Sequence, residues 1–222
     1  MSLDTLLGKK VGMSQIWDDD GNVIPVTIIK AGPCQVVQVK SKDGKDGYDA
    51  IQLGFESLPA RKGGAGDPRA NKPMRGHFAR HSAEPHRRVQ EVRLTLQKGQ
   101  AAPEAGAVLK VDAVFAGVAE VDVSGTTKGR GFQGTVKRHG FARGPVTHGS
   151  KNTREPGSVS AEHRVVIRGK KMPGHMGDVA RTVRNLRVVK LEPEHDLIYV
   201  KGAVPGPNGG AVTIRKAKSP RS

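Results

Sequence analysis

The chain contains 222 residues, and its 37 Lys and Arg outnumber its 21 Asp and Glu to give a net charge of +16. No apolar run is long enough to span a bilayer, residues 1–10 lack the features of a secretory signal, and the single cysteine excludes an intrachain disulfide and suits a reducing cytosol. So large a positive charge attracts polyanions. The 29 glycines bury no side chain, so we expect a small core and one compact domain of about 120–150 residues with irregular attachments.

The first 55 residues predict a β-meander. Its strands are expected at residues 13–17, 23–30, 34–40 and 48–55, where β-branched and apolar residues cluster or alternate. Turn signals separate the outer pairs of strands, in the stretches DDDGN (18–22) and DGKDG (43–47). The following residues 56–73 predict a loop, and MRGHFARH (74–81) predicts one or two helical turns.

Further strands are predicted on both sides of a segment that has no regular period. They cover residues 87–96, 119–125, 181–192, 197–204 and 211–217. Residues 97–108 predict a loop, and we expect the terminal residues 218–222 to be flexible. The chain is therefore predicted to be mainly β, with one globular domain formed by residues 1–125 and 178–217.

The segment at 126–177 differs from the rest of the chain in charge and glycine content. Between Gly125 and Gly177, eleven Lys and Arg face only two acids, so this quarter carries +9, together with 11 glycines. Apart from a possible short helix at 132–138 it shows no period, and so long an irregular segment is usually functional or disordered. The candidate RNA-binding residues are its cations and one histidine: Lys128, Arg130, Lys137, Arg138, Arg143, His148, Lys151, Arg154, Arg164, Arg168, Lys170 and Lys171.

Within this segment, Gly129, Gly131 and Gly134 have the spacing of a dinucleotide-binding fingerprint. That motif requires a preceding strand, a long apolar helix and a second parallel strand. Residues 119–125 could supply the first strand, but residues 135–152 predict neither the helix nor the strand after it. A nucleotide-dependent oxidoreductase is therefore the weaker alternative, and no cofactor or small-molecule substrate is expected.

The histidines and the cysteine do not form a metal or catalytic motif. His139, His148, His163 and His175 follow one another at gaps of 9, 15 and 12 residues, which is not the spacing of a structural zinc site. Cys34 lies in an apolar strand, so we expect a buried structural thiol. Neither a nucleophile elbow nor a P-loop occurs, so nothing in the sequence argues for an enzyme.

The composition of residues 126–177 suits a folded RNA as the partner. Lys and Arg neutralise phosphates, and glycine lets the backbone approach them and offer N–H groups. Because the segment cannot form its own core, we expect RNA to order it. Phe132 and Phe141 could each stack on a base or tether the segment to the globular domain. The alternatives are a disordered basic linker and a general nucleic-acid-binding or RNA-chaperone module.

Seven stretches of the chain occur in an order that is highly specific. They are LLGKKVGMSQIWDDDGNVIPVTII, DGYDAIQLGF, NKPMRGHFAR, VDVSGTTKGRGFQGTVKRHGF, THGS, RGKKMPGHMG and LIYVKGAVPGPNGG. Together they resemble the ribosomal protein L3 family of the bacterial large subunit. The resemblance implies a closed six-stranded barrel of the translation-protein type, with a long irregular basic extension inserted before the last strands.

The same resemblance implies a function. The chain would be a structural constituent of the large ribosomal subunit in the cytoplasm, bind 23S rRNA, support early assembly and send its extension toward the peptidyl-transferase centre. Neighbouring large-subunit ribosomal proteins are the implied protein partners. The chain departs from the family pattern at the tip of the extension, near Thr153 and at Val159–His163, and by an insertion at residues 61–70. Some relatives of the family carry a modified glutamine at the tip of the extension. In this chain no glutamine follows Gln133, so that modification is not expected.

Overall fold

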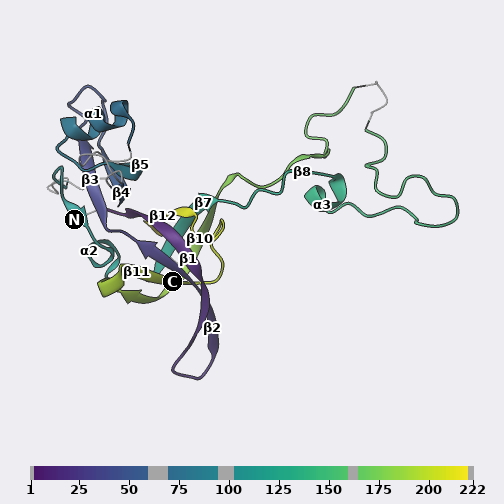
Figure 1. Ribbon diagram of the computed structural model, residues 1–222. Helices are drawn as coiled ribbons and strands as arrows, with labels where there is room; N and C mark the ends of the chain where they lie inside the picture. Colours follow the sequence, from purple (N-terminus) through teal and green to yellow (C-terminus); the bar gives the residue numbers. More distant parts are fainter. Residues whose placement is uncertain (1–2, 60–69, 95–102, 160–164, 220–222) are drawn as a thin grey trace. The chain divides into compact units, whose positions relative to one another are not determined.

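The computed structural model describes residues 3–59, 70–94, 103–159 and 165–219 (Figure 1). The chain divides into two units. The globular unit consists of Met1–Thr126 and Ala180–Ser222, and the arm consists of Thr127–Val179. No helix in the described ranges has both the length and the apolar character that crossing a bilayer requires.

The largest sheet of the globular unit is a ring of six strands (Figure 1). In chain order these are β1 (Thr5–Trp17), β2 (Val23–Ala31), β7 (Glu120–Thr126), β10 (Ala180–Glu192), β11 (Leu197–Lys201) and β12 (Ala211–Lys216). Each strand pairs antiparallel with two others, in the order β1-β12-β7-β10-β11-β2, and β2 pairs in turn with β1. The prediction of a mainly β chain is confirmed, and the arm is inserted in sequence between two neighbouring strands of the ring, β7 and β10.

Strand β1 begins at Thr5, well before the strand predicted at 13–17. The prediction missed residues 5–12 because glycines and lysines interrupt the apolar pattern there. A Cβ on Gly8 would lie 2.6 Å from the carbonyl oxygen of Lys30, so the close pairing with β2 requires glycine. The register shifts between Lys10 and Gly12, and such a bulge bends a strand and increases its twist. Lys10 is buried, and its Nζ donates to the carbonyl of Val204 at 2.9 Å.

A second antiparallel sheet has the order β5-β4-β3-β6. Its strands are β3 (Cys34–Lys40), β4 (Ala50–Ser57), β5 (His86–Arg93) and β6 (Val108–Leu109). The predicted meander over the first 55 residues is therefore wrong, because β1 and β2 belong to the ring and β3 and β4 to this sheet. The chain changes sheet at Gly32, whose φ of +94° is a glycine conformation, and at Pro33, which has no N–H for a ladder.

Helix α1 (Lys72–Arg80) confirms the helical turns predicted at 74–81. It begins at Asn71, whose side chain accepts a hydrogen bond from the Met74 N–H at 3.1 Å. The short elements α2 (Val111–Phe115), η1 (Pro193–His195) and β6 were not predicted, because so few residues show no period. The predictions that fall on residues 60–69 and 95–102 lie outside the described residues.

One apolar core is shared by the ring and the second sheet. Its fully buried members include Leu6, Ile198 and Ile214 of the ring, Ile51 and Leu53 of the second sheet, and Phe115 of α2. Cys34 belongs to this cluster, so its predicted burial is confirmed. Burial raises the pKa of its thiol to about 12. The thiol is therefore protonated at neutral pH and packs as a small apolar group.

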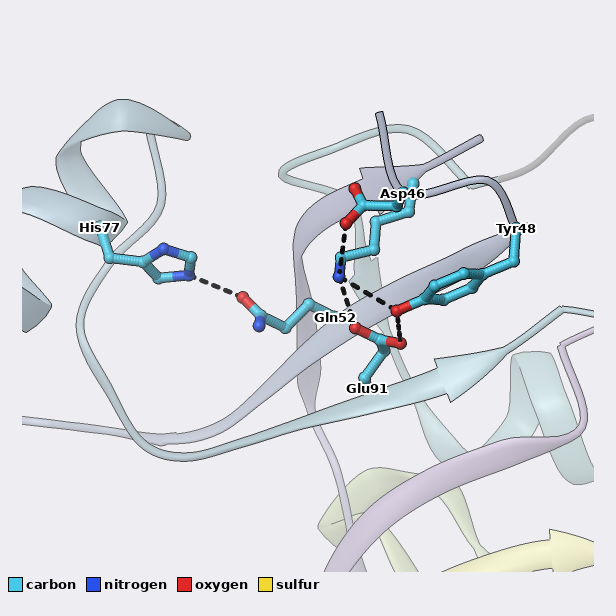
Figure 2. A network of polar contacts seen from close by, with 6 residues as sticks. Asp46, Tyr48, Gln52, His77 and Glu91 are labelled. Carbon is cyan, nitrogen blue, oxygen red and sulfur yellow. Dashed lines mark hydrogen bonds and ion pairs between the residues drawn. The ribbon is translucent and has the colours of Figure 1, made fainter. Parts of the chain in front are cut away.

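A polar network lies on the second sheet (Figure 2). The ammonium of Lys40 is 2.8 Å from Glu91 Oε2 and 3.3 Å from Asp46 Oδ1, and it donates to the hydroxyl of Tyr48. That hydroxyl donates to Glu91 Oε1 at 2.7 Å. The network fixes the turn between β3 and β4 against β5. Hydrogen bonds from Lys40 and then Tyr48 lower the pKa of Glu91, and the bond to Glu91 raises the pKa of Lys40.

Replacing Glu91 with Gln is expected to lower the Tm by on the order of 1–3 °C, and only within a pH window. A carboxyl with a depressed folded pKa stabilises above its unfolded pKa and loses that effect as pH falls through the folded pKa. An amine with a raised pKa stabilises below its unfolded pKa and loses that effect as pH rises through the folded pKa. The window is therefore about pH 5 to 10. Thermal unfolding across pH measures it, with exposed Glu194→Gln as the control, and an equal loss at pH 3 would contradict the assignment.

Candidate nucleic-acid interface

The base of the arm is formed by two antiparallel segments. Thr127 N donates to Val179 O at 3.0 Å, and Arg130 N donates to Met176 O at 2.8 Å. Backbone hydrogen bonds therefore order the base of the arm without a core. We call residues 127–133 and 174–179 the stem, and its paired strands are β8 (Phe132–Gln133) and β9 (Gly174–His175).

Two glycines of the stem lie where other atoms of the arm approach closely: a carbonyl of the backbone at Gly177, and the end of the Arg138 side chain at Gly174. Gly177 has a φ of +77°, and a Cβ there would collide with the carbonyl oxygen of Lys128. A Cβ on Gly174 would lie 2.7 Å from Nη1 of Arg138. The sequence suggested that glycines of this segment let the backbone approach phosphate. At these two positions the structure shows a different reason for glycine.

Helix α3 (Thr135–His139) follows the stem and confirms the short helix predicted near 132–138. Nη1 of Arg138 donates to the carbonyl of Met172 at 2.7 Å, and Nε2 of His139 donates to the same oxygen at 2.9 Å. Two donors on one carbonyl tie α3 to the returning half of the arm. Arg138, which the sequence marked only as a phosphate contact, therefore also positions the arm's own backbone.

Beyond α3, two turns shape the distal part of the arm. Gly144 N donates to Thr153 O at 3.0 Å, which closes residues 144–153 into a loop. Lys170 N donates to Ile167 O at 3.1 Å and forms a second turn. The first loop carries His148 and Lys151, and the second turn leads into the Lys170–Lys171 pair.

The side chains predicted to contact phosphate are nearly all exposed. Arg138 is half-buried, and Arg164 lies outside the described residues. The exposed members are Lys128, Arg130, Lys137, Arg143, His148, Lys151, Arg154, Arg168, Lys170 and Lys171. Among the described residues of the arm only Thr135 is buried. Eleven Lys and Arg against three acids give the arm a net charge of +8. All of its described cations except Arg138 are exposed to solvent.

The two aromatic residues of the arm differ in environment. Phe132 is 77% exposed, so its ring can stack on a base. Phe141 is half-buried, and its ring centroid lies 6.1 Å from that of His139. The sequence left stacking and tethering open for both residues. The structure favours stacking for Phe132 and contact with α3 for Phe141.

The dinucleotide fingerprint is not realised. Gly129 and Gly131 belong to the stem, β8 has two residues, and α3 has five, which is far shorter than the helix that holds a pyrophosphate. The described histidines of the arm also form no metal centre, since no group of three or more His, Cys, Asp or Glu suited to a metal occurs in the described part of the chain. His163 lies outside that part.

A core-poor, glycine-rich arm that exposes most of its cations defines a polyanion-binding protein of the ribonucleoprotein class. Comparison with known proteins is more specific. The family model described as Ribosomal protein L3 matches residues 94–194. The chain is 51% identical over 221 residues to large ribosomal subunit protein uL3 of Pelotomaculum thermopropionicum, which covers 97% of this chain and 98% of that protein.

Two further relatives with the same name agree. The protein of Thermotoga maritima is 49% identical over 218 residues, or 97% of this chain and 98% of its own. That of Carboxydothermus hydrogenoformans is 47% identical over 213 residues, or 96% of each chain. The chain belongs to the ribosomal protein L3 family, which confirms the resemblance found in its seven stretches. It is accordingly a ribosomal protein and not an enzyme.

Sequence reasoning missed two features of this interface, the positioning role of Arg138 and the carbonyl of Met172 on which it acts. Neither leaves a local signal, because the two residues are 34 positions apart in the chain. Gly177 could have been found in part from the sequence, because it ends the stretch RGKKMPGHMG. The residues around it form one half of the stem and pair with the half that begins at Thr127.

Proposed function

We propose that the chain is a structural constituent of the large subunit of the cytoplasmic ribosome, where it binds 23S rRNA. The single observation that carries the proposal is the exposure of ten predicted RNA-binding residues along an arm with one described buried side chain. Membership in the L3 family supports it, because the relatives are named as proteins of the large subunit. The same membership argues against a general RNA chaperone.

The proposal assigns different roles to the two parts of the chain. Residues 1–125 and 178–217 form a closed six-stranded barrel of the translation-protein type, which the double pairing of every ring strand supports. Residues 126–177 form an extension that enters the rRNA, supports early assembly and is directed toward the peptidyl-transferase centre. Neighbouring large-subunit proteins contact the barrel.

The physical mechanism is electrostatic capture followed by ordering. Each phosphate that a Lys or Arg neutralises releases condensed counterions, which makes binding favourable and salt-dependent. The stem already joins the two ends of the arm, so RNA needs to order only the distal turns, and a closed loop loses less entropy than a free chain. Positive-φ glycines such as Gly149 and Gly169 supply the sharp turns between cations.

The Lys170–Lys171 pair tests this function. Replacing both residues with Glu is expected to weaken binding to 23S rRNA about 30-fold at physiological salt, because two phosphate contacts are lost. Incorporation into large subunits should fall accordingly. Filter binding measures the first effect, and gradient sedimentation of tagged protein measures the second.

A matched control is Lys42→Glu with Lys45→Glu, which makes the same change in charge on exposed residues of the globular unit. We expect this control to incorporate nearly normally. Both pairs should leave the circular dichroism spectrum and the Tm unchanged. Normal incorporation of the Lys170/Lys171 variant would show that this pair is only solvated and contacts no RNA.

A further inference from the structure

A shallow depression of about 510 Å³ lies on the globular unit, on the side of the ring formed by β7, β10 and β12. Three cations line it, Arg184, Arg215 and Lys218, together with the hydroxyls of Ser124 and Thr182. We call this depression the basin. Its cations come from two places in the sequence, Arg184 in β10 and the stretch 215–218 near the C-terminus, and none of them belongs to the arm.

A bulge in β10 directs one of these cations into the basin. The register between β10 and β7 shifts between Val183 and Leu186, which leaves Arg184 and Asn185 outside the ladder. Asn185 has a φ of +54°, and its N–H donates to Asp122 Oδ1 at 2.9 Å. Bulges of this kind re-aim side chains and are frequent at functional sites. Asp122 therefore satisfies the backbone of the bulge.

The backbone next to the second cation, Lys218, is held by two hydrogen bonds. Nδ2 of Asn185 donates to the carbonyl of Ser219 at 2.6 Å, and Ala217 N donates to Glu120 O at 3.1 Å. These bonds fix the chain on both sides of Lys218. Residues 218 and 219, expected from the sequence to be flexible, are therefore bonded to the ring, whereas 220–222 lie outside the described residues.

The third cation and the hydroxyls share the surface of the ring. Arg215 of β12 is half-buried and pairs in register with Asp122 of β7. In the next outward-facing row, Ser124 and Thr182 face each other with their hydroxyl oxygens 2.8 Å apart. Hydroxyls, guanidinium groups and an ammonium are the groups that bind phosphodiester oxygens.

Among the described residues that line the basin, positive charges outnumber negative ones. Three cations face one acid, Asp122, one of whose carboxylate oxygens accepts the Asn185 N–H. We propose that the basin is a second phosphate-binding site, which takes the phosphodiester backbone of rRNA on the globular unit independently of the arm. This inference rests on the proposed function. It gives the chain two separate grips on the RNA, one by the arm and one by the ring.

The test is a triple variant, Arg184→Gln, Arg215→Gln and Lys218→Gln, titrated with 23S rRNA over a range of salt. Loss of about two phosphate contacts should make the slope of log K against log salt shallower by about 1.6 and weaken binding about 20-fold near 0.15 M salt. Lys42→Gln, Lys45→Gln and Lys110→Gln remove the same charge from exposed sites elsewhere and should change binding less than about 3-fold.

A second variant separates charge from folding. The double variant Arg184→Lys with Arg215→Lys keeps both positive charges. It should retain most of the wild-type affinity, since phosphate oxygens also accept hydrogen bonds from an ammonium group. Equal binding by the triple variant and the wild type would overturn the basin as a phosphate site. An equal loss in the control triple would also overturn it, by showing a general charge effect. Failure of the wild type to bind 23S rRNA would instead contradict the proposed function.

Discussion

Replacing Phe141–Lys171 with a four-residue Gly/Ser linker is expected to weaken binding to 23S rRNA about 300-fold near 0.15 M salt. Seven of the eleven Lys and Arg of the arm lie in this segment. If half of them meet phosphates, the slope of log K against log salt becomes shallower by about 3. The stem and α3 remain, and so does the Met172 carbonyl that Arg138 and His139 bind.

The same deletion should leave the globular unit folded. Every described residue of the buried core cluster belongs to that unit, so the deletion removes none of them. Circular dichroism should show a cooperative, β-rich unfolding transition, while sedimentation should show the variant missing from mature large subunits. Loss of the transition would mean that the arm is part of the core. Functional ribosomes that carry the deletion would mean that the globular unit alone performs the function.

Replacing Gly177 with Ala is expected to cost about 3 kcal/mol of stem stability and to weaken rRNA binding up to about 100-fold. An L-residue is strained at a φ of +77°, and the new Cβ would collide with the Lys128 carbonyl. Opening the stem separates the two ends of the arm, so RNA must then order them as well. Hydrogen exchange of the Arg130 and Met176 amides, which are both bonded across the stem, measures the opening directly.

Gly134→Ala is the matched control. Gly134 lies beside the stem with a φ of −70°, and a Cβ there meets no atom within 4 Å. Gly134 is the N-cap of α3, where Ala is a poorer cap than Gly but reduces the entropy of the unfolded chain. We therefore expect a net effect on exchange and on binding below about 1 kcal/mol. If both variants bind rRNA like the wild type, then the close approach at Gly177 is not needed for the arm to function.

The sequence predicted the elements that have a period, and it failed where long-range pairing decides the structure. The strands at 34–40 and 181–192 were found within a residue, because each is a continuous stretch rich in β-branched residues. Most of β1 was missed, since Gly8 and Lys10 break its pattern. The close contact of Gly8 with β2 and the bond from Lys10 to Val204 are contacts between strands, which local composition does not reveal.

The sequence predicted one part of the candidate site and missed the part that depends on long-range pairing. Charge and glycine content located the arm, because both are properties of a contiguous segment. The stem depends on pairs such as Thr127 with Val179, which lie 52 residues apart, and two-residue strands leave no pattern. The basin depends on a bulge at Arg184 and on a register that brings Arg215 beside it. These residues are ordinary surface cations in the sequence, and the pairing of β7 with β10 and β12 brings them together.

We propose that this chain binds 23S rRNA through its exposed arm. Crosslinking of the tagged protein to RNA in living bacterial cells, followed by mapping of both the nucleotides and the peptides, tests it most directly. We expect 23S rRNA to dominate the crosslinked RNA and most crosslinked peptides to come from residues 127–179. Crosslinks spread over messenger and transfer RNA, or an arm without crosslinks beside a crosslinked globular unit, would contradict it.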